Sequence, residues 1–324
     1  MKKIRIAVVG CKNMGSKHVK CLLNKFSGDV KIAGILNSTP QSSAVKAEEL
    51  GVPYFENLAD ITKRTVDAVI ISTPAENHFE TARYIIGKGI PCLIEKPFAT
   101  NEEECLELMK LAETQGVPVM VGHTENYNPA VVRLKELLTG RQVMSIAAIR
   151  TSANPGVKQT HIISELMIHD LAIVNSLLGS DFETAIVSKD DKYRWDEQAV
   201  AEMRYWNKAI VRLEAVRADV PIERHMRVID DKQNIYQIDF PARKLLKNGE
   251  PVTAGGDSLA AELGNFISVL RGNESPLISL EEAKENVGLC NQLEKISGAE
   301  RNFQKNMGCS CIGQVSSLYK QVER

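Results

Sequence analysis

The 324-residue chain exceeds the usual size of one hydrophobic core, so two domains are expected. Apolar residues make up 44% and charged residues 25%, as in ordinary globular proteins, and the net charge is -1. This balance gives no reason to expect nucleic acid or a membrane as a partner, and no apolar run is long enough to span a bilayer.

The first 122 residues alternate between apolar strand patterns and amphipathic helix patterns. Strands are predicted at 4–9, 30–36, 66–72, 90–94 and 117–121. Helices are predicted after Gly10, from Pro40 to Gly51, up to Gly89 and from the capping residue Asn101. Such alternation predicts a doubly wound parallel sheet, so residues 1–122 are expected to form a nucleotide-binding Rossmann domain. The apolar stretch at 4–9 is too short for a signal-peptide core, which favours a cytoplasmic protein.

The pattern changes after residue 122. A helix is expected from Pro129, a strand at 143–150 and an apolar helix at 165–178. Further strands are predicted at 199–206, 209–218, 224–229 and 235–240. Two last helices are expected, from Asp257 to before Gly272 and from the capping box at 279–282 to before Gly298. Residues 123–324 therefore predict an α/β domain with a large, mostly antiparallel sheet.

Seven cysteines, an odd number, are scattered along the chain and mostly lie in helix or strand patterns. This distribution favours reduced thiols over a disulfide framework. Cys309 and Cys311 form a close pair, but no further cysteine or histidine lies nearby in the sequence to complete a metal site. We therefore expect no bound metal.

A glycine-containing turn, GCKNMG at 10–15, follows the first predicted strand. In a dinucleotide fingerprint, the first glycine makes a tight turn, the second lets the backbone approach the pyrophosphate and the third permits close helix packing. Gly10 and Gly15 fill the first and third positions, whereas Lys12 replaces the middle glycine and either pushes the pyrophosphate outward or pairs with it. The helix that begins here offers backbone donors and a positive dipole end. The predicted cofactor contacts are Gly10, Lys12, Asn13, Met14 and Gly15.

The second predicted strand ends in Asn37, Ser38 and Thr39, where an NAD enzyme usually places an acid against the ribose hydroxyls. Without a carboxylate a 2′-phosphate would be tolerated, but no arginine stands there to hold it. Asn37 and Ser38 are candidate cofactor contacts. NAD is the expected cofactor, with NADP as the alternative.

Lys96 ends the fourth strand pattern within Glu95-Lys96-Pro97. In an open α/β sheet, ligands bind outside the carboxyl ends of the strands, so Lys96 and the glycine turn would face one site. A lysine beside a cofactor can act as an acid, a base or an electrostatic clamp. An ordinary lysine at a strand end is the alternative interpretation.

Glu165 and His169 are four residues apart on a predicted helix and would share one face. Histidine titrates near neutral pH and can exchange a proton with a substrate hydroxyl. A carboxylate one turn away would orient the imidazole or bind another hydroxyl. The alternative is a histidine packed in the core.

Together these motifs resemble the glucose-fructose oxidoreductase / inositol dehydrogenase / MocA family of NAD(P)-dependent sugar dehydrogenases. The resemblance extends to about residue 297 and is carried by VVGCKNMGSKHV, ISTPAENHFETA, LIEKPFATNEEE, GHTENYNPAV and ELMIHD. The EKP triplet with the upstream TPxxxH pattern is its most specific part, whereas the glycine turn is not specific.

The resemblance implies that Lys96 lies beside nicotinamide and substrate and that the Lys96-Pro97 peptide is cis. The family's D-x-x-x-H pair, a carboxylate and a catalytic histidine, matches Glu165 and His169, although glutamate replaces aspartate. Asn126 stands where the family has arginine, and Tyr127 is expected to lie against the sugar. Further positions align with the lining of the cofactor site: Thr73, Pro74, Asn77, His78 and Glu95.

The implied activity is hydride transfer between nicotinamide and a secondary hydroxyl of a sugar, nucleotide-sugar or cyclitol. His169 would take the hydroxyl proton, Lys96 would stabilise the alkoxide or share the proton relay, and Glu165 would position substrate or His169. These three residues and Tyr127 form the predicted substrate site. The resemblance also implies that residues 123–324 bind the substrate and form a homodimer or homotetramer through the large sheet.

Two other functions stay open. The first is a cofactor- or sugar-sensing regulatory protein without turnover, which the departures at Lys12, Asn37 and Glu165 would favour. The second is redox-neutral glycoside cleavage with retained NAD. Retention of Lys96 and His169 favours the dehydrogenase.

Overall fold

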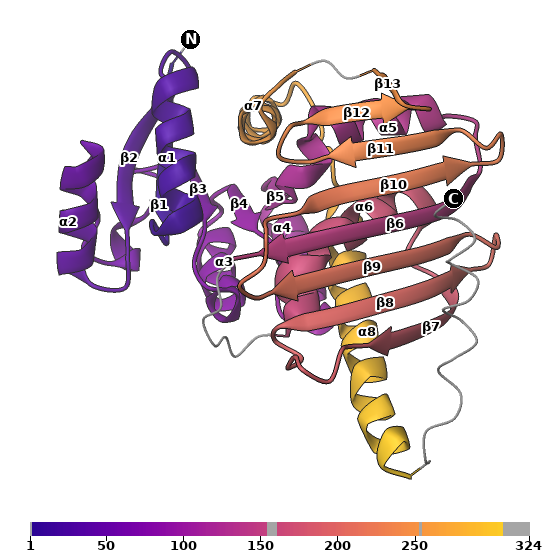
Figure 1. Ribbon diagram of the computed structural model, residues 1–324. Coiled ribbons are helices and arrows are strands. Elements are labelled where there is room, and N and C mark those ends of the chain that lie inside the picture. Colours follow the sequence, from indigo (N-terminus) through magenta and orange to yellow (C-terminus); the bar gives the residue numbers. More distant parts are fainter. Residues whose placement is uncertain (1, 154–160, 253–254, 307–324) are drawn as a thin grey trace.

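A five-stranded parallel sheet forms the N-terminal part of the protein, as predicted (Figure 1). The computed structural model describes residues 2–153, 161–252 and 255–306. The strand order is β2-β1-β3-β4-β5. The strands are β1 (Ile4–Val9), β2 (Val30–Leu36), β3 (Ala68–Ile71), β4 (Cys92–Glu95) and β5 (Val119–Gly122). All residues of β3, β4 and β5 are buried, which explains why these segments read as continuous apolar runs.

Four helices connect these strands, and their ends match the signals in the sequence. They are α1 (Asn13–Lys25), α2 (Pro40–Leu50), α3 (His78–Gly87) and α4 (Glu102–Gln115). The Asn101 side chain accepts a hydrogen bond from the Glu104 N–H at 2.8 Å, which caps α4. Gly51 ends α2 with a φ of 65°, a left-handed conformation that suits glycine.

The second sheet has eight strands in the order β13-β12-β11-β10-β6-β9-β8-β7. Its strands are β6 (Val143–Ser152), β7 (Phe182–Ser188), β8 (Gln198–Tyr205), β9 (Ile210–Arg217), β10 (Arg224–Asp230), β11 (Ile235–Asp239), β12 (Lys244–Lys247) and β13 (Glu250–Pro251). Neighbours pair antiparallel except for β6 and β9, which run parallel. The predicted large, mostly antiparallel sheet is thus confirmed.

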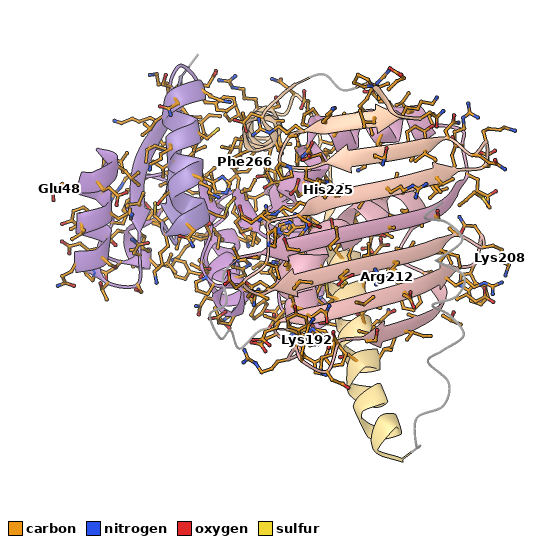
Figure 2. All side chains as sticks on the ribbon, in the orientation of Figure 1. Glu48, Lys192, Lys208, Arg212, His225 and Phe266 are labelled. Carbon is orange, nitrogen blue, oxygen red and sulfur yellow. The ribbon has the colours of Figure 1, made fainter. Side chains whose placement is uncertain are left out.

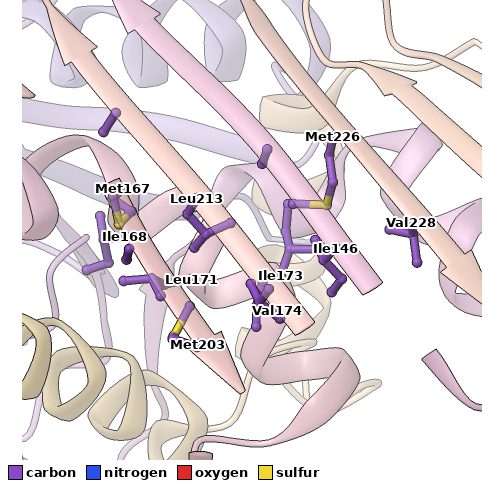
Figure 3. Packing of buried hydrophobic residues seen from close by; sticks show 14 of the residues in the cluster. Ile146, Met167, Ile168, Leu171, Ile173, Val174, Met203, Leu213, Met226 and Val228 are labelled. Carbon is purple, nitrogen blue, oxygen red and sulfur yellow. The ribbon is translucent and has the colours of Figure 1, made fainter. Parts of the chain in front are cut away.

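Among the described residues, helices cover one face of this sheet and leave the other open. In Figure 1, α5 (Pro129–Leu138), α6 (Ile168–Leu178) and α8 (Leu280–Asn306) lie behind the sheet. Leu171 of α6 packs in one hydrophobic cluster with Leu213 of β9 and with other side chains of the strands (Figure 3). Residues that alternate with these core positions belong to the open face, which we call the open sheet face.

Two helix boundaries differ from the predictions. The helix expected from residue 165 starts with a π-helical turn, η4 (Ile163–Met167), before α6. This π-helical turn covers part of the interval before His169, so regular α-helical spacing does not describe the Glu165–His169 pair, and their shared face stays a prediction. The prediction that the last helix ends before Gly298 was wrong, because α8 continues to Asn306. Cys309 and Cys311 lie outside the described residues.

Helix α7 (Ser258–Leu270) packs against α1 and η3 (Thr124–Tyr127), although it follows the second sheet in the chain. Lys25 Nζ lies 2.6 Å from Asp257 Oδ2, a contact between α1 and the residue that caps α7. The last part of the chain therefore supports the first sheet. The division at residues 122 and 123 stays a prediction, since α7 crosses it in space.

Within the described ranges, no helix combines the length and apolarity needed to cross a lipid bilayer. The five described cysteines are free and buried: Cys11, Cys21, Cys92, Cys105 and Cys290. Burial raises the pKa of the Cys92 and Cys290 thiols. Both side chains are therefore neutral thiols that act as small apolar groups.

Candidate active site

The turn after β1 is built so closely against the end of β3 that only glycine fits at its first position. Gly10 has a φ of +86°, and a Cβ there would lie 2.5 Å from the backbone of Ser72 and Thr73. A Cβ on Gly15 would collide with the Gly10 carbonyl oxygen. The two predicted fingerprint glycines therefore make a tight turn and a close start of α1.

The N-terminus of α1 has the features of an anion-binding helix end. Lys12 is the residue before the helix and its side chain makes no capping hydrogen bond, so it leaves the first backbone N–H groups uncapped. Lys12 and Asn13 are exposed, Met14 is half-buried, and the first turn contains no acid. The buried hydroxyls of Ser72 and Thr73 have no hydrogen-bond partner among the described residues. Backbone donors, positive dipole and Lys12 thus fit a dinucleotide pyrophosphate.

Asn37 fixes this turn with its side chain. Its Oδ1 accepts the Cys11 backbone N–H at 2.7 Å, and its Nδ2 donates to the Ser42 carbonyl at 3.1 Å. The neighbouring Ser38 is exposed. Since the Asn37 amide is engaged with the backbone, Ser38 is the freer of the two predicted ribose contacts. The choice between NAD and NADP stays a prediction.

His78 joins the end of β3 to the segment after β4. Its two ring nitrogens lie 2.8 Å from the Thr73 carbonyl oxygen and 2.7 Å from that of Pro97. Burial lowers the pKa of His78. The His78 ring thus holds the ends of β3 and β4 together. Pro74 and Asn77, which precede α3, are exposed. The Lys96-Pro97 peptide is cis, as expected.

Glu95, the residue before Lys96, belongs to a buried group of three ionisable side chains from α1, β4 and α7. His18 Nε2 lies 2.6 Å from Glu95 Oε1, and one ligand atom of Glu262 lies within 4.8 Å of both partners. Burial opposes ionisation of Glu95, but its hydrogen bond to His18 and the charge of that ring outweigh burial, so its pKa is lowered. Burial and the nearby charge of Glu95 raise the pKa of Glu262 well above its usual range. Glu262 is thus held as a neutral acid beside an ionised one.

Replacing Glu262 with glutamine is expected to make stability less dependent on pH. An unfolded glutamate ionises near pH 4.3, whereas the folded state resists this ionisation because the pKa of Glu262 is raised. The free energy of unfolding of the wild type therefore falls by about 1.4 kcal/mol per pH unit between the unfolded and the folded pKa. Glutamine has no proton to lose and keeps an oxygen for the Thr124 hydroxyl, which donates to Glu262.

Urea unfolding of the wild type and of E262Q between pH 5 and 8 measures this difference. The free energy of unfolding of E262Q should increase relative to that of the wild type as pH rises. The exposed Glu113→Gln change on α4 is the matched control and should leave the pH dependence unchanged. Parallel curves for the wild type and E262Q would contradict a neutral Glu262.

Lys96 links β4 to the helical segment of the second predicted domain. Its Nζ donates to the Glu165 backbone carbonyl at 2.6 Å, and the side chain is half-buried. Burial lowers the pKa of Lys96, against the raising effect of the Glu95 and Glu165 carboxylates. The ammonium therefore lies at the carboxyl end of the parallel sheet. Because burial disfavours its charged form, it loses its proton more easily than an exposed lysine does.

The Glu165 carboxylate is held by the second sheet. Its Oε2 lies 2.6 Å from Nη2 of Arg217, the buried last residue of β9. The Glu165 carbonyl thus accepts the hydrogen bond from Lys96, and the Glu165 carboxylate forms an ion pair with Arg217. These contacts give it a positioning role and do not show the predicted contact with His169.

His169 lies at the start of α6, half-buried, and its Nδ1 has no hydrogen-bond partner among the described residues. Burial is the main cause that lowers its pKa well below 6.5, and the charges of Lys96 and Arg150 add to it. The imidazole is therefore neutral at pH 7 and able to accept a proton.

The next residue, Asp170, binds a buried arginine. Arg150 donates from Nε and Nη2 to the two Asp170 carboxylate oxygens at 2.8 and 2.9 Å, and from Nη1 to Glu125 at 3.0 Å. Burial lowers the pKa of Arg150, but the two carboxylates outweigh burial and raise it. This bidentate pair fixes the start of α6 on β6 and so orients the residue before Asp170.

Tyr127 and Asn126 lie in η3, against α7. The Tyr127 hydroxyl donates to Asn265 Oδ1 at 2.8 Å, and its ring belongs to the hydrophobic cluster of Phe266. These contacts use Tyr127 for packing and give its predicted sugar contact no support. Asn126 is fully buried and accepts a hydrogen bond from Lys135 Nζ at 2.9 Å. Lys135 of α5 thus lies next to the position where the resembled family has arginine, and burial lowers the pKa of Lys135 to about 8.

Sequence reasoning missed the residues that surround the predicted ones. Arg150, Arg217 and Arg224 are charged residues at the ends of apolar strand patterns, which is the signal that would have marked them. His18 and Glu262 lie on helices at positions that face inward, and nothing in the local sequence sets their partners.

Residues 4–123 match the family model described as an oxidoreductase family with an NAD-binding Rossmann fold, GFO_IDH_MocA. The N-terminal part of the chain, residues 4–123, belongs to this family. The protein is therefore an NAD(P)-dependent oxidoreductase, and the matched residues include the glycine turn and Lys96.

Curated relatives extend the similarity of this oxidoreductase beyond the Rossmann part. UDP-N-acetylglucosamine 3-dehydrogenase of Acidithiobacillus ferrooxidans is 27% identical over 285 residues, 82% of this chain and 88% of that protein. Inositol 2-dehydrogenase 2 of Saccharopolyspora erythraea is 30% identical over 191 residues, 56% of each chain. The solved structure of the Acidithiobacillus enzyme has the same fold, with a TM-score of 0.82 at 24% identity, over 91% of this chain and 98% of that one.

Proposed function

We propose that the protein transfers a hydride between NAD(P) and a secondary hydroxyl of a sugar, nucleotide-sugar or cyclitol. The observation that carries this proposal is the hydrogen bond from Lys96 Nζ to the Glu165 carbonyl, 2.6 Å long. It joins the carboxyl end of β4 to the helical segment that carries His169. The charge of the Lys96 ammonium also contributes to the lowered pKa of His169, which supports a common site at the carboxyl end of the parallel sheet.

Each of these residues has a distinct task in the proposed reaction. Bound NAD(P)+ supplies the hydride acceptor when the alcohol is oxidised. His169 takes the hydroxyl proton, because its ring is neutral at pH 7 and its Nδ1 has no hydrogen-bond partner among the described residues. Lys96 stabilises the negative charge that develops on the substrate oxygen. Glu165 is a positioning residue that holds Lys96 through its backbone and is itself held by Arg217.

The relatives support the proposed substrate class. One acts on a nucleotide-linked amino sugar at position 3 and another on inositol at position 2, and both names describe a ring with secondary hydroxyls. The match to the first covers more of the chain. UDP-N-acetylglucosamine is therefore the first substrate to test, followed by myo-inositol and free N-acetylglucosamine.

Nicotinamide fluorescence with purified protein, titrated separately with NADH and NADPH, tests the cofactor part. Saturable binding of at least one form is expected, since the α1 N-terminus is uncapped and Lys12 is exposed. Absorbance at the NAD(P)H band during incubation with the oxidised form of that cofactor and each candidate substrate then tests turnover. Binding without turnover of any ring alcohol would favour the sensing function. Copurified NAD together with glycoside cleavage and no net NADH would favour the redox-neutral enzyme.

The open sheet face supports the proposed homodimer or homotetramer. It combines exposed apolar side chains, such as Ile186 and Ile210, with the paired charges of Arg212, Glu202 and Glu214. A broad sheet face of this kind is commonly covered by another copy of the chain. Assembly and a cytoplasmic location stay predictions.

A further inference from the structure

Three arginines lie at one end of the inner, helix-covered face of the second sheet, on the neighbouring strands β10, β6 and β9. Arg224 starts β10 and is the register partner of Arg150 on β6. Arg217 ends β9, which runs parallel to β6 and pairs Arg217 with Ser152. This is the end of the sheet nearest to the Rossmann strands, where Figure 2 labels His225, the residue after Arg224. Arg217 contacts Glu165, and the charges of Arg150 and Arg224 act on His169, so all three arginines lie near the candidate active site.

Two of these arginines have carboxylate partners within the protein. Arg150 uses the fork of Nε and Nη2 for Asp170 and donates from Nη1 to Glu125. Arg217 contacts the Glu165 carboxylate at 2.6 Å and donates from Nη1 to the Asp196 carbonyl at 3.2 Å. Both are nearly inaccessible, with relative side-chain exposures of 1% and 3%. Their charges are used to hold the site together.

Arg224 differs from both. Its Nε is buried and has no hydrogen-bond partner, and no described carboxylate forms an ion pair with it. The acids whose charges act on Arg224 are Glu125 and Asp170, and Arg150 already binds both. Arg224 itself is only half-buried, so part of its side chain is accessible.

The position of Arg224 also relates it to the reacting groups. Its charge is one of the causes that lower the pKa of His169, after burial and the charges of Lys96, Arg150 and His123. Burial lowers the pKa of Arg224, and the charge of Arg150 acts in the same direction. An anion on a ligand would stabilise this guanidinium, because no carboxylate of the described residues forms an ion pair with it.

We propose that Arg224 is a specificity-determining residue that binds an anionic oxygen group of the substrate, a phosphate or a carboxylate. Nε and a terminal Nη of a guanidinium form a planar fork that matches such groups with two parallel hydrogen bonds. Arg150 shows this geometry on the adjacent strand, where the Asp170 carboxylate occupies the fork. The inference rests on the proposed function, since it places a substrate beside His169. Arg224 in this role would favour a charged sugar derivative over a neutral cyclitol as the substrate.

Arg227 shows that a free Nε alone does not define such a site. It lies three residues further along β10 and also has a buried Nε without a partner. Successive side chains of a strand point to opposite faces, so Arg227 belongs to the open sheet face. It shares the residue type, the strand and the unpartnered nitrogen with Arg224, but not the active site. Arg227→Gln is therefore the matched control.

Isothermal titration calorimetry on the full chain tests the inference without turnover. The probes are UDP, which carries phosphates, and D-glucuronate, which carries a carboxylate. Wild type and R227Q are expected to bind one of them with affinities within twofold of each other, and R224Q at least tenfold more weakly. The probe that binds tells phosphate from carboxylate. Equal affinity for the wild type and R224Q, or no binding of either probe by the wild type, would overturn the proposal.

A second variant separates charge from geometry and from folding. Arg224→Lys keeps the charge but loses the planar fork, so it is expected to bind the probe more weakly than the wild type and more tightly than R224Q. If R224Q does not fold, the probe affinity of R224K is the deciding measurement. An R224K affinity equal to that of the wild type would overturn the proposal. NADH fluorescence on the same samples reports the cofactor site separately. Loss of anion binding with normal NADH binding supports the role of Arg224 whether or not a dehydrogenase substrate has been found.

Discussion

Replacing Lys96 with methionine is expected to lower kcat by about 10²–10⁴-fold and to change NADH affinity little. Methionine keeps the apolar stem of the side chain but removes the ammonium that would face the developing alkoxide. The cofactor affinity depends mainly on the glycine turn and the α1 N-terminus, which Lys96 does not form. Steady-state kinetics with the substrate found by screening, and nicotinamide fluorescence for NADH, measure the two quantities.

The pH profile separates a catalytic Lys96 from a purely structural one. Burial lowers the pKa of Lys96, so the wild type should lose activity as pH rises through this lowered value, where the ammonium becomes neutral. That limb of the profile should be absent in K96M. Lys110→Met on α4 is a control without a contact at the site and should behave as the wild type. Unchanged turnover in K96M would remove Lys96 from the mechanism.

Replacing Arg150 with methionine is expected to lower the free energy of unfolding by about 3–5 kcal/mol. Arg150 is 1% exposed and Asp170 2%, so the change leaves a carboxylate buried without its bidentate partner. Glu125 loses a partner as well. Removal of one member of a buried pair costs more than the pair contributes as a whole. Urea unfolding at pH 7 measures the loss.

Two further variants test this explanation for Arg150. Arg212→Met on the open sheet face breaks exposed contacts with Glu202 and Glu214 and should cost less than about 1 kcal/mol. Combining R150M with Asp170→Leu should recover part of the loss, because the buried charge disappears with its partner. If R150M lowers the free energy of unfolding no more than R212M does, the buried pair contributes little to stability.

The Rossmann sheet could be predicted because local signals and global fold agree there. β1 and β2 have the predicted bounds, since their apolar runs are bounded by Gly10 and by the polar residues after Leu36. β3 is shorter than predicted because Val66 is buried without joining the ladder. The apolar pattern thus marks buried residues, and these extend beyond the residues that pair in the sheet.

The second sheet was predictable as a class but not in its details. β7 was missed because it is an edge strand in which only Val187 is buried, so it has no apolar run. The parallel pairing of β6 with β9 joins residues far apart in the chain, and no local pattern encodes such a pairing. The π-helical turn before α6 was missed because the apolar spacing of Ile163 and Leu166 also suits a regular helix.

The sequence by itself determined the cofactor turn, the lysine at the end of β4 and the histidine on the apolar helix. Each has a local signal: glycines between a strand and a helix, a charge after an apolar run, or an ionisable residue on an apolar face. Tertiary structure alone decided the partners of these groups, such as Glu165 with Arg217, Asp170 with Arg150 and Glu95 with His18. These pairs join residues far apart in the chain. Their energies depend on burial and on distances of a few ångströms, which are fixed only when the sheets and helices have packed together.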